Sequence, residues 1–415
     1  MAQLQPVRGT HDILPDEYAR FRHVVDTARH AAMLFGYREM ATPIIEFTDV
    51  FARSMGETSD VVSKEMYSFT DKGGEELTLR PEYTAGICRA FISNGLQQHV
   101  PFKAFGWGPM FRFERPQKGR QRQFHQIDVE LIGAAEPEAD VEVISVAAEI
   151  LRRLGILDKC VLELNTLGDP ESRVGYRKAL VDYFSAHVDK LSEDSRRRLE
   201  KNPLRILDSK DEGDKKLVAN APLIEEFLTP TARDFFNAVK DGLGNAGVEF
   251  TVSPRLVRGL DYYTHTAFEF TTTMLGAQGT VLAGGRYDGL IEQLGGPPTP
   301  GIGWAGGIER LVLLSNPLPV PPRVIAVVPI GAEAEAEALK IATELRRNDI
   351  PVELAYKGNA GKRFKRADKL GCFAAVVIGG DEMAKNVVVL RDLASGAQTE
   401  VPRDMLVGQL KRLQA

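Results

Sequence analysis

Two segments of strand length separated by a basic stretch, together residues 104–133, constrain the fold more than any other part of the sequence. Residues 104–112 mix aromatic and apolar side chains, and residues 124–132 alternate polar with apolar side chains as a half-buried strand does. We therefore expect a β-hairpin that forms the floor of a site. Four cations occupy the eight residues from 115 to 122: Arg115, Lys118, Arg120 and Arg122.

The alternation in the second segment places Gln126, Asp128 and Glu130 on one face of the hairpin. Burying a polar group without a partner costs roughly 2–7 kcal/mol even when the group is neutral, and more when it is a carboxylate. This face therefore needs something polar to meet it, and we expect a small polar ligand.

The basic connection begins with Arg112 and Glu114 at the end of the first segment. A guanidinium group binds phosphate or carboxylate oxygens through paired hydrogen bonds, so arginines here suit a polyphosphate or the end of a nucleic acid. A solvated loop that binds nothing explains the same charges, and the connection alone does not decide between these interpretations.

The composition is that of a globular protein. With 415 residues, 43% hydrophobic and 26% charged, the chain is long enough for about two or three domains. Its apolar runs are shorter than the ~18 residues of a membrane span, and its first residues lack the pattern of a secretion signal, so we expect a cytoplasmic protein without membrane contact. Cys88, Cys160 and Cys372 lie far apart, which predicts free thiols and no metal centre. The net charge of −5 leaves local basic clusters to contact any nucleic acid.

The first part of the chain predicts a helix, a strand and a second hairpin. The helix should begin at Pro15 and end near Gly36, and Pro43 should confine the next strand to an edge or an interface. An interface strand would suit a dimer. Residues 64–80 should form a hairpin that is followed by a helix over residues 85–94.

The junction after this hairpin offers polar side chains where a strand meets a helix. Pro81 keeps Arg80 extended, so Glu82 and Thr84 are placed as acceptors for an ammonium group. Capping of the helix explains the same two residues. Both interpretations stay open.

The middle of the chain, residues 169–245, changes to charged helical sequence and predicts an inserted helical module. Strand character returns after it, and a short bend carries Arg258 beside a glycine, with Tyr262 and Tyr263 close behind. Either phenol suits a protein core as well as a ligand site. Residues 284–288 should form a turn after a further strand.

The last third predicts a glycine-rich strand and then a separate domain. Residues 301–314 should run from that strand into an apolar helix that starts with Glu309 and Arg310, and the glycines leave room for a flat ring. After a proline-rich boundary, the chain should form a compact α/β domain without a phosphate-binding loop. The cations of its helix over residues 361–371 form either a phosphate-contacting surface or a solvated face.

Several motifs in a fixed order carry a resemblance to a known family. Pro43 with its strand, residues 111–114 with the basic connection, and residues 301–310 resemble the three signature motifs of class II aminoacyl-tRNA synthetases. The RGLDYY sequence at 258–263 and the AGGRYDGL sequence at 283–290 resemble segments peculiar to the histidyl-tRNA synthetases. The resemblance covers nearly the whole chain.

The resemblance implies an α+β fold. It implies a catalytic domain in residues 1–168 and 246–316 with the class II antiparallel sheet flanked by helices, a helical insertion domain in residues 169–245, and an α/β anticodon-binding domain in residues 323–415. The implied activity is histidine–tRNA ligation in the cytoplasm: L-histidine and ATP give histidyl-adenylate and pyrophosphate, and histidine then passes to the 3′ end of tRNA(His). The implied partners are L-histidine, ATP with Mg²⁺ on its β- and γ-phosphates, tRNA(His), and a second copy of the chain in a homodimer.

The resemblance also implies roles for individual residues. Arg112 and Arg258 would act in catalysis, because a carboxylate is a nucleophile at pH 7 and needs cations at the reacting phosphate rather than a base. Glu130 and Tyr263 would bracket the imidazole, whose donor and acceptor nitrogens both need partners. The histidine site would comprise Glu82, Tyr83, Thr84, Arg112, Gln126, Glu130, Arg258, Tyr262 and Tyr263. ATP would be held by Arg112, Glu114, Phe124 and Arg310, and the tRNA acceptor end by Arg115, Gln117 and Arg120.

Phe113, Gln121 and the pair Thr264–His265 depart from the commonest bacterial pattern, which bears on acceptor-stem specificity rather than on activation chemistry. His265 is expected to be structural.

Two alternative functions remain. One is a non-catalytic, histidine-sensing regulatory subunit of ATP phosphoribosyltransferase, although that relative usually lacks the C-terminal domain and some of the arginines. The other is a class II synthetase for threonine or proline, against which Tyr262, Tyr263 and Glu130 argue.

Overall fold

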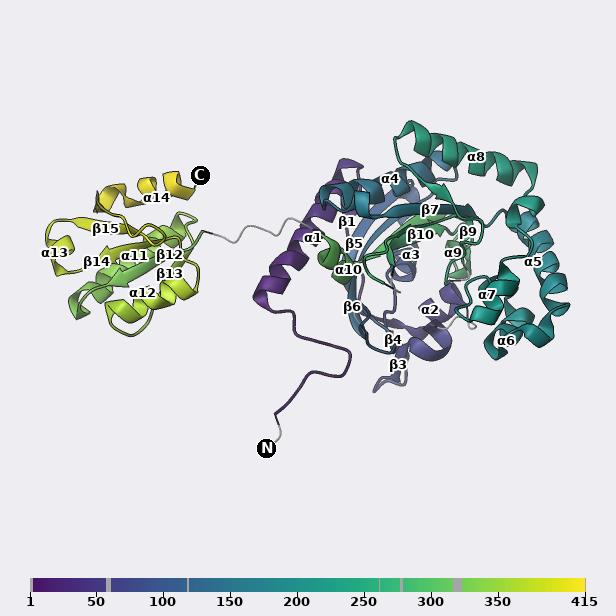
Figure 1. The fold of residues 1–415 in the computed structure, drawn as a ribbon, viewed down its shortest axis with the longest axis horizontal. Coiled ribbons are helices and arrows are strands. Elements are labelled where there is room, and N and C mark those ends of the chain that lie inside the picture. The colour runs from purple at the N-terminus through teal and green to yellow at the C-terminus, as the bar shows by residue number, and fades with distance from the viewer. Residues whose placement is uncertain are drawn as a thin grey trace. The chain divides into compact units, whose positions relative to one another are not determined.

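The computed structural model describes residues 3–56, 61–117, 119–260, 262–276, 279–315 and 323–414. The chain forms two compact units, Met1–Pro319 and Val320–Ala415, each with its own hydrophobic core (Figure 1). Lys118 of the basic connection and Asp261 of the bend lie outside the described residues. Within those ranges, none of the helices has the length and apolar character that crossing a bilayer demands.

An eight-stranded sheet forms the centre of the first unit (Figure 1). Its order is β1-β5-β6-β11-β10-β9-β7-β8, and all neighbours are antiparallel except the outermost pairs, β1 with β5 and β7 with β8. The predicted antiparallel sheet of an α+β fold is thereby confirmed. The strands are β1 Arg38–Glu39, β5 Phe102–Phe111, β6 Gln123–Ile132, β7 Val161–Thr166, β8 Thr251–Val252, β9 Thr264–Thr271, β10 Thr280–Arg286 and β11 Gly301–Gly307.

The predicted hairpin is β5 and β6. The two strands pair continuously from Phe102 with Ile132 to Phe111 with Gln123. Ile127, Val129 and Leu131, the apolar members of the alternation in β6, all join the main core on one face of the sheet. The polar members are thereby left for the opposite face.

Helices cover both faces of the sheet. On the face of the main core, apolar side chains of α1 Pro15–Leu34, α4 Pro137–Arg153, α8 Pro230–Asn245 and α10 Ile308–Leu314 pack on the strands. The helix predicted from Pro15 is confirmed, and Gly36 follows it with a φ of +84°. On the opposite face of the sheet, a second core includes residues of α2 Thr48–Met55, α3 Thr84–Ser93 and α9 Leu290–Gln293.

A small three-stranded sheet in the order β2-β4-β3 precedes α3. Its strands are β2 Ile45–Phe47, β3 Tyr67–Thr70 and β4 Glu76–Leu79, so the hairpin predicted at residues 64–80 is confirmed. Pro43 lies just before β2, which is an edge strand, as expected for a strand limited by a proline.

A turn was predicted at residues 284–288, and this prediction is wrong for residues 284–286. Gly284, Gly285 and Arg286 belong to β10, and the chain turns only after them. A Cβ atom on Gly284 would lie 2.1 Å from the carbonyl oxygen of Gly303 and 2.5 Å from the Cβ of Trp304. The glycine therefore serves the close approach of neighbouring strands and not a turn.

The segment between β7 and β8 is helical, as predicted from its composition. Side chains from α5 Pro170–Ser185, α7 Glu212–Val218 and the neighbouring loops share a small core of their own, against which Leu199 of α6 Glu193–Lys201 packs. The last helix, α8, instead packs against α4 and contributes to the main core (Figure 1). The N-cap side chains are Asp169, Ser192, Asp211 and Thr229, each accepting a backbone N–H of the first turn.

The second unit is a five-stranded sheet in the order β13-β12-β14-β15-β16 with helices packed on it. The α/β pattern predicted after the proline-rich boundary is confirmed. Of the basic helix α12, Arg363 is buried and pairs with Glu335, so that cation serves packing. The elements are β12 Ile325–Pro329, α11 Glu335–Arg347, β13 Val352–Leu354, α12 Ala360–Lys369, β14 Ala374–Ile378, α13 Gly380–Ala384, β15 Val387–Asp392, β16 Gln398–Pro402 and α14 Leu406–Gln414.

Candidate active site

The floor of the candidate site is the polar row of β6: Gln126, Asp128 and Glu130. Asp128 and Glu130 are fully buried. Every residue beside this row is small, which leaves space above it. The register partners are Gly307, Ala305 and Gly303 on β11, and Gly108, Gly106 and Ala104 on β5.

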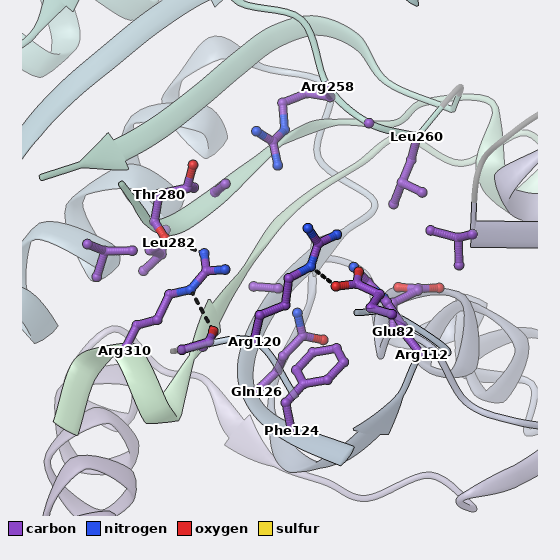
Figure 2. A pocket seen from close by; sticks show the side chains of 18 of the residues that line it. Glu82, Arg112, Arg120, Phe124, Gln126, Arg258, Leu260, Thr280, Leu282 and Arg310 are labelled. Atoms are coloured by element: carbon purple, nitrogen blue, oxygen red, sulfur yellow. Dashed lines mark hydrogen bonds and ion pairs between the residues drawn. The ribbon is translucent and has the colours of Figure 1, made fainter. Parts of the chain in front are cut away.

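A cavity of about 350 Å³ opens beside this row; Gln126 lines it, whereas Asp128 and Glu130 lie beneath its lining. Figure 2 shows the guanidinium groups of Arg120, Arg258 and Arg310 reaching it from different elements. The structure thereby brings together four segments that are far apart in the sequence. The predicted site residues that line the cavity are Glu82, Thr84, Arg112, Glu114, Arg120, Phe124, Gln126, Arg258, Tyr262, Tyr263 and Arg310.

Arg112 and Arg120 approach the cavity from the hairpin connection. Arg112 donates from Nε to the carbonyl oxygen of Pro81 at 2.8 Å, and its guanidinium lies 5.3 Å from the centre of the Phe124 ring. Arg120 pairs with Glu114. Arg112 thus lines the cavity with a side chain whose orientation is fixed by its backbone contact.

Arg310, at the start of α10, and Arg258, in the loop between β8 and β9, also line the cavity. Arg310 donates to the carbonyl oxygens of Gly119, at 3.3 Å, and Thr280, at 2.6 Å. Burial, followed by repulsion from Arg120 and Arg112, lowers the pKa of Arg310. Clustered cations that repel one another would be stabilised by a polyanion between them.

Arg258 pairs with Glu269 on β9, and its guanidinium lies 5.8 Å from the centre of the Tyr263 ring. Burial opposes its charge, but Glu269, Tyr263 and Tyr262 together outweigh that effect, and the pKa of Arg258 is raised. Its Nε atom is buried and has no hydrogen-bond partner within the described structure. Arg258 therefore stays positively charged at the cavity, and its Nε–H group can donate a further hydrogen bond.

Glu130 is held at the end of the floor by two hydroxyl groups. Thr84 donates from Oγ1 to its Oε1 at 2.5 Å, and Tyr287 donates to its Oε2. Burial raises the pKa of Glu130 to about 8, against the opposing effect of these two hydrogen bonds. A carboxyl group in this state can change its proton within the physiological range.

Glu82 contributes to the helix start and to the cavity at the same time. Its Oε1 accepts the N–H of Ala85 at 2.8 Å, which is the capping contact foreseen as an alternative. The residue also lines the cavity, where burial raises the pKa of its carboxyl group and Arg112 partly offsets that shift. Capping and ligand binding therefore do not exclude each other here.

Tyr262 and Tyr263 form one wall of the cavity. Their rings lie 4.6 Å apart, and Tyr262 also meets Tyr287 edge to face at 5.9 Å. Burial raises the pKa of both phenols, so each keeps its O–H as a hydrogen-bond donor. A flat polar ring bound beside them would meet donors in fixed positions.

The remaining predicted residues do not line the cavity. Tyr83 is buried with its ring 4.3 Å from the guanidinium of Arg80, and Glu130 lies just beneath the lining layer at Thr84. Arg115 and Gln117 are exposed in the connection. His265, expected to be structural, packs against Phe235 with ring centres 4.9 Å apart.

Three residues that belong to the site were missed by sequence reasoning. Tyr287 reaches Glu130 from the segment interpreted as a turn. Lys210 lines the cavity from the helical insertion. Glu309 also lines it and accepts both the backbone N–H and the Nδ1 contact of His125, the latter at 2.9 Å, so the start of α10 is held on β6. Glu309, adjacent to Arg310, and Tyr287, within the AGGRYDGL sequence, stood in motifs already singled out, whereas Lys210 did not.

The arrangement suits a ligand with an ammonium group, a carboxylate and a polyphosphate. Acceptors gather at Glu82 and Gln126, while guanidinium groups gather on the other sides. Cations fixed around one space stabilise negative charge that develops there during a reaction. The geometry therefore favours transfer chemistry at a phosphate over hydrolysis by a nucleophilic side chain.

Comparisons with known proteins agree with this chemistry. Residues 9–311 match the family model described as histidyl-tRNA synthetase, and residues 324–413 match the anticodon binding domain. A histidine–tRNA ligase of Rhodospirillum rubrum is 60% identical over 402 residues, which is 97% of each chain. One of Gluconacetobacter diazotrophicus is 57% identical over 413 residues, 100% of each chain.

Among solved structures, apo histidyl-tRNA synthetase of S. aureus matches with a TM-score of 0.84 and 34% identity, covering 99% of this chain and 100% of that one. A Bacillus halodurans structure, described as an ATP phosphoribosyltransferase regulatory subunit/histidyl-tRNA synthetase, matches with a TM-score of 0.66 over 92% of this chain and 99% of its own. At 23% identity, the second similarity shows the fold alone.

Proposed function

The chain belongs to the histidyl-tRNA synthetase family and its activity is the ATP-dependent ligation of histidine to tRNA, and from this premise we propose which of its residues carry each step. The observation that supports the assignment is the convergence of Arg112, Arg258 and Arg310 on one cavity that Glu82 and Gln126 also line, with the buried acids Asp128 and Glu130 on the same strand as Gln126. Histidine would bind over the floor, and ATP along the arginines.

Histidine would be recognised through its three polar groups. Glu82, Thr84 and Gln126 would receive the α-ammonium group, and Arg112 with Arg258 the carboxylate. Glu130 and Tyr263 would bracket the imidazole, with Tyr262 beside them. Tyr83 would support the site from below, because its ring packs under Arg80 and outside the cavity.

ATP would lie between the hairpin connection and α10. Phe124 and Glu114 would hold the adenine, Arg112 the α-phosphate, and Arg310 the more distant phosphates. The mutual repulsion that lowers the pKa of Arg310 supports this proposal, because a triphosphate would relieve it.

Mg²⁺ would accompany the triphosphate. Magnesium prefers phosphate oxygens and water together with at most one or two carboxylates. Among the described residues no three His, Cys, Asp or Glu side chains cluster as a complete metal centre, while Glu309 lines the cavity next to Arg310. This donor set fits an ion that is held chiefly by the β- and γ-phosphates and neutralises their charge.

In the first step, a carboxylate oxygen of histidine would attack the α-phosphorus of ATP. A phosphorus–oxygen bond to histidine forms, the bond to the bridging oxygen of pyrophosphate breaks, and the electron pair leaves with pyrophosphate. Arg112 and Arg258 would stabilise the charge on the α-phosphate from two sides. No general base is required, because the carboxylate is already ionised.

In the second step, the terminal ribose hydroxyl of tRNA(His) would attack the histidyl carbonyl carbon and release AMP. Arg115, Gln117 and Arg120 would position the acceptor end, and the unit formed by Val320–Ala415 would bind the anticodon. Of the three residues, Arg120 alone lines the cavity, so it would act in both steps.

A homodimer and a cytoplasmic location complete the proposal. Ile45 and Phe47 of the edge strand β2 are exposed, which suits a surface covered by a second copy of the chain. A cytoplasmic location follows from the substrates ATP and tRNA.

The test is exchange of labelled pyrophosphate into ATP by the purified protein. Exchange should require histidine and should not occur with threonine or proline. Exchange without histidine dependence would contradict the assignment. Folded protein that binds histidine but neither exchanges pyrophosphate nor charges tRNA would favour the histidine-sensing regulatory subunit, which the high identity to histidine–tRNA ligases does not support.

A further inference from the structure

Asp128 is a buried carboxyl group without a hydrogen bond. Its side chain is 0% exposed, and neither of its oxygen atoms has a partner in the described part of the chain. Oε1 of Gln126, the next residue along the same face of β6, is also buried and unpartnered. Buried polar groups in proteins are nearly always hydrogen-bonded, so exceptions clustered at one place indicate a missing donor.

The surroundings of Asp128 are built to leave room for that donor. Its neighbours across the sheet are Gly106 on β5 and Ala305 on β11, and Ala305 lines the cavity. A Cβ atom on Gly106 would lie 2.4 Å from the ring of Tyr83, so this side is already filled by that ring. Asp128 itself lies beneath the lining of the cavity, and the open direction from it is therefore along Ala305 toward the cavity.

The charges near Asp128 do not balance it. Burial raises its pKa well above the usual value, and Glu130 and Glu82 raise it further, while Arg80 and Arg112 act in the opposite direction. These two arginines are already engaged by backbone carbonyl oxygens: Arg80 by Thr42 and Pro109, and Arg112 by Pro81. The acidic floor is thus short of a cation.

We propose that Asp128 is the charge partner of the substrate's α-ammonium group and acts as a positioning residue beneath Glu82 and Gln126. An ammonium group has three N–H donors and no acceptor, which matches the three unpartnered acceptor atoms of Asp128 and Gln126. A neutral imidazole has one N–H donor and a carboxylate has none, so either would leave most of these acceptors unsatisfied. The inference rests on the proposed function, because that proposal places the amino end of histidine at Glu82 and Gln126.

The test compares Asp128→Asn and Asp128→Ser with the unmodified protein, using three ligands. Histidine has both end groups, histidinol keeps the ammonium group without the carboxylate, and imidazolepropionate keeps the carboxylate without the ammonium group. Removing a buried charge partner should weaken the binding of histidine and histidinol by at least about tenfold, while the binding of imidazolepropionate and ATP should change by less than about twofold. The readouts are KM for histidine and ATP in pyrophosphate exchange and inhibition constants for the two analogues.

Glu163→Gln provides a matched control. Glu163 is a carboxylate on β7 of the same sheet that pairs with Thr271 and does not line the cavity, so all three ligands should bind as before. Equal weakening of all three ligands in either Asp128 variant, or unchanged binding of histidine, would overturn the role of Asp128. Two variants are used so that a folding defect in one does not decide the result. If the unmodified protein showed no histidine-dependent exchange, the proposed function itself would be wrong.

Discussion

Gly303 and Glu130 are register partners on adjacent strands, and a Cβ atom on Gly303 would lie 1.7 Å from Oε2 of Glu130. The carboxyl group that closes the floor therefore occupies the space of an absent side chain. Tyr287, which donates to the same oxygen, holds it there. Glu130 can thus take this position because Gly303 has no side chain.

Gly303→Ala should displace Glu130 and weaken histidine recognition. Overpacking of this kind costs about 1–3 kcal/mol, and we expect a lower free energy of unfolding together with a KM for histidine raised about tenfold or more. Gly306→Ala on the same strand is the control, because its Cβ would meet the side chains of Ile127, at 3.3 Å, and Leu282, at 3.6 Å, and not Glu130. If both substitutions raise KM equally, the effect comes from the strand and not from Glu130.

The titration of Glu130 predicts a pH dependence of stability. Its pKa is raised from 4.5 to about 8 in the folded protein, so the folded state binds more protons than the unfolded state between these values. The free energy of unfolding contributed by this group should therefore be full below about pH 4.5, fall by at most about 1.4 kcal/mol per pH unit, and be lost above about pH 8.

Glu130→Gln should remove that slope. Glu82 and Asp128 are also buried acids with raised pKa values, so the measured quantity is the difference between variant and unmodified protein in urea unfolding at several pH values. The stability difference should shift in favour of the glutamine variant as the pH rises from about 5 to about 8. A difference that is constant over this range would show that Glu130 titrates normally.

The sequence predicted the elements of this site better than their contacts. The hairpin was predictable because residues 126–131 of β6 alternate polar and apolar side chains, and the helix from Pro15 because its apolar spacing and its proline agree. These are local properties of the chain. They determine which face each residue occupies before any long-range contact forms.

The remaining features depend on contacts between distant segments. Tyr287 reaches Glu130 only because Gly284 and Gly285 continue β10, whereas two adjacent glycines more often indicate a turn. Lys210 reaches the cavity only through the folding of the insertion against it. The sequence likewise could not show that Glu82 both caps a helix and lines the cavity, because its position before the helix is compatible with either role.

Arg258→Ala should retain the fold and most of the histidine affinity but lose adenylate formation. Its partner Glu269 keeps the hydrogen bond from Thr280 at 2.9 Å, so the removed charge does not leave that carboxylate without a donor. By analogy with the loss of a preorganised donor at a developing negative charge, the rate of pyrophosphate exchange should fall about 10²–10³-fold. Calorimetric titration with histidine measures binding separately, and exchange at the unmodified rate would exclude Arg258 from the mechanism.

Arg115 and Arg120 should separate the two steps of the reaction. Arg115 is exposed and outside the cavity, whereas Arg120 lines it and pairs with Glu114. Arg115→Ala should leave exchange within about twofold of the unmodified protein but weaken tRNA binding, and it should reduce the slope of log affinity against log salt by about 1. Arg120→Ala should lower exchange and tRNA charging together.

The control for this pair is Arg152→Ala, an exposed arginine of α4 that pairs with Glu149 and should change neither step. Exchange and tRNA charging are measured on the same preparations, and circular dichroism measures the folded fraction separately, because a loss of folded protein would reduce both activities in parallel as Arg120→Ala is expected to do. Charging by Arg115→Ala at the unmodified rate and salt dependence would mean that the acceptor end is held by other cations. The exposed half of the basic connection would then be the solvated loop that its sequence also permits, while the half that lines the cavity would keep its role with ATP.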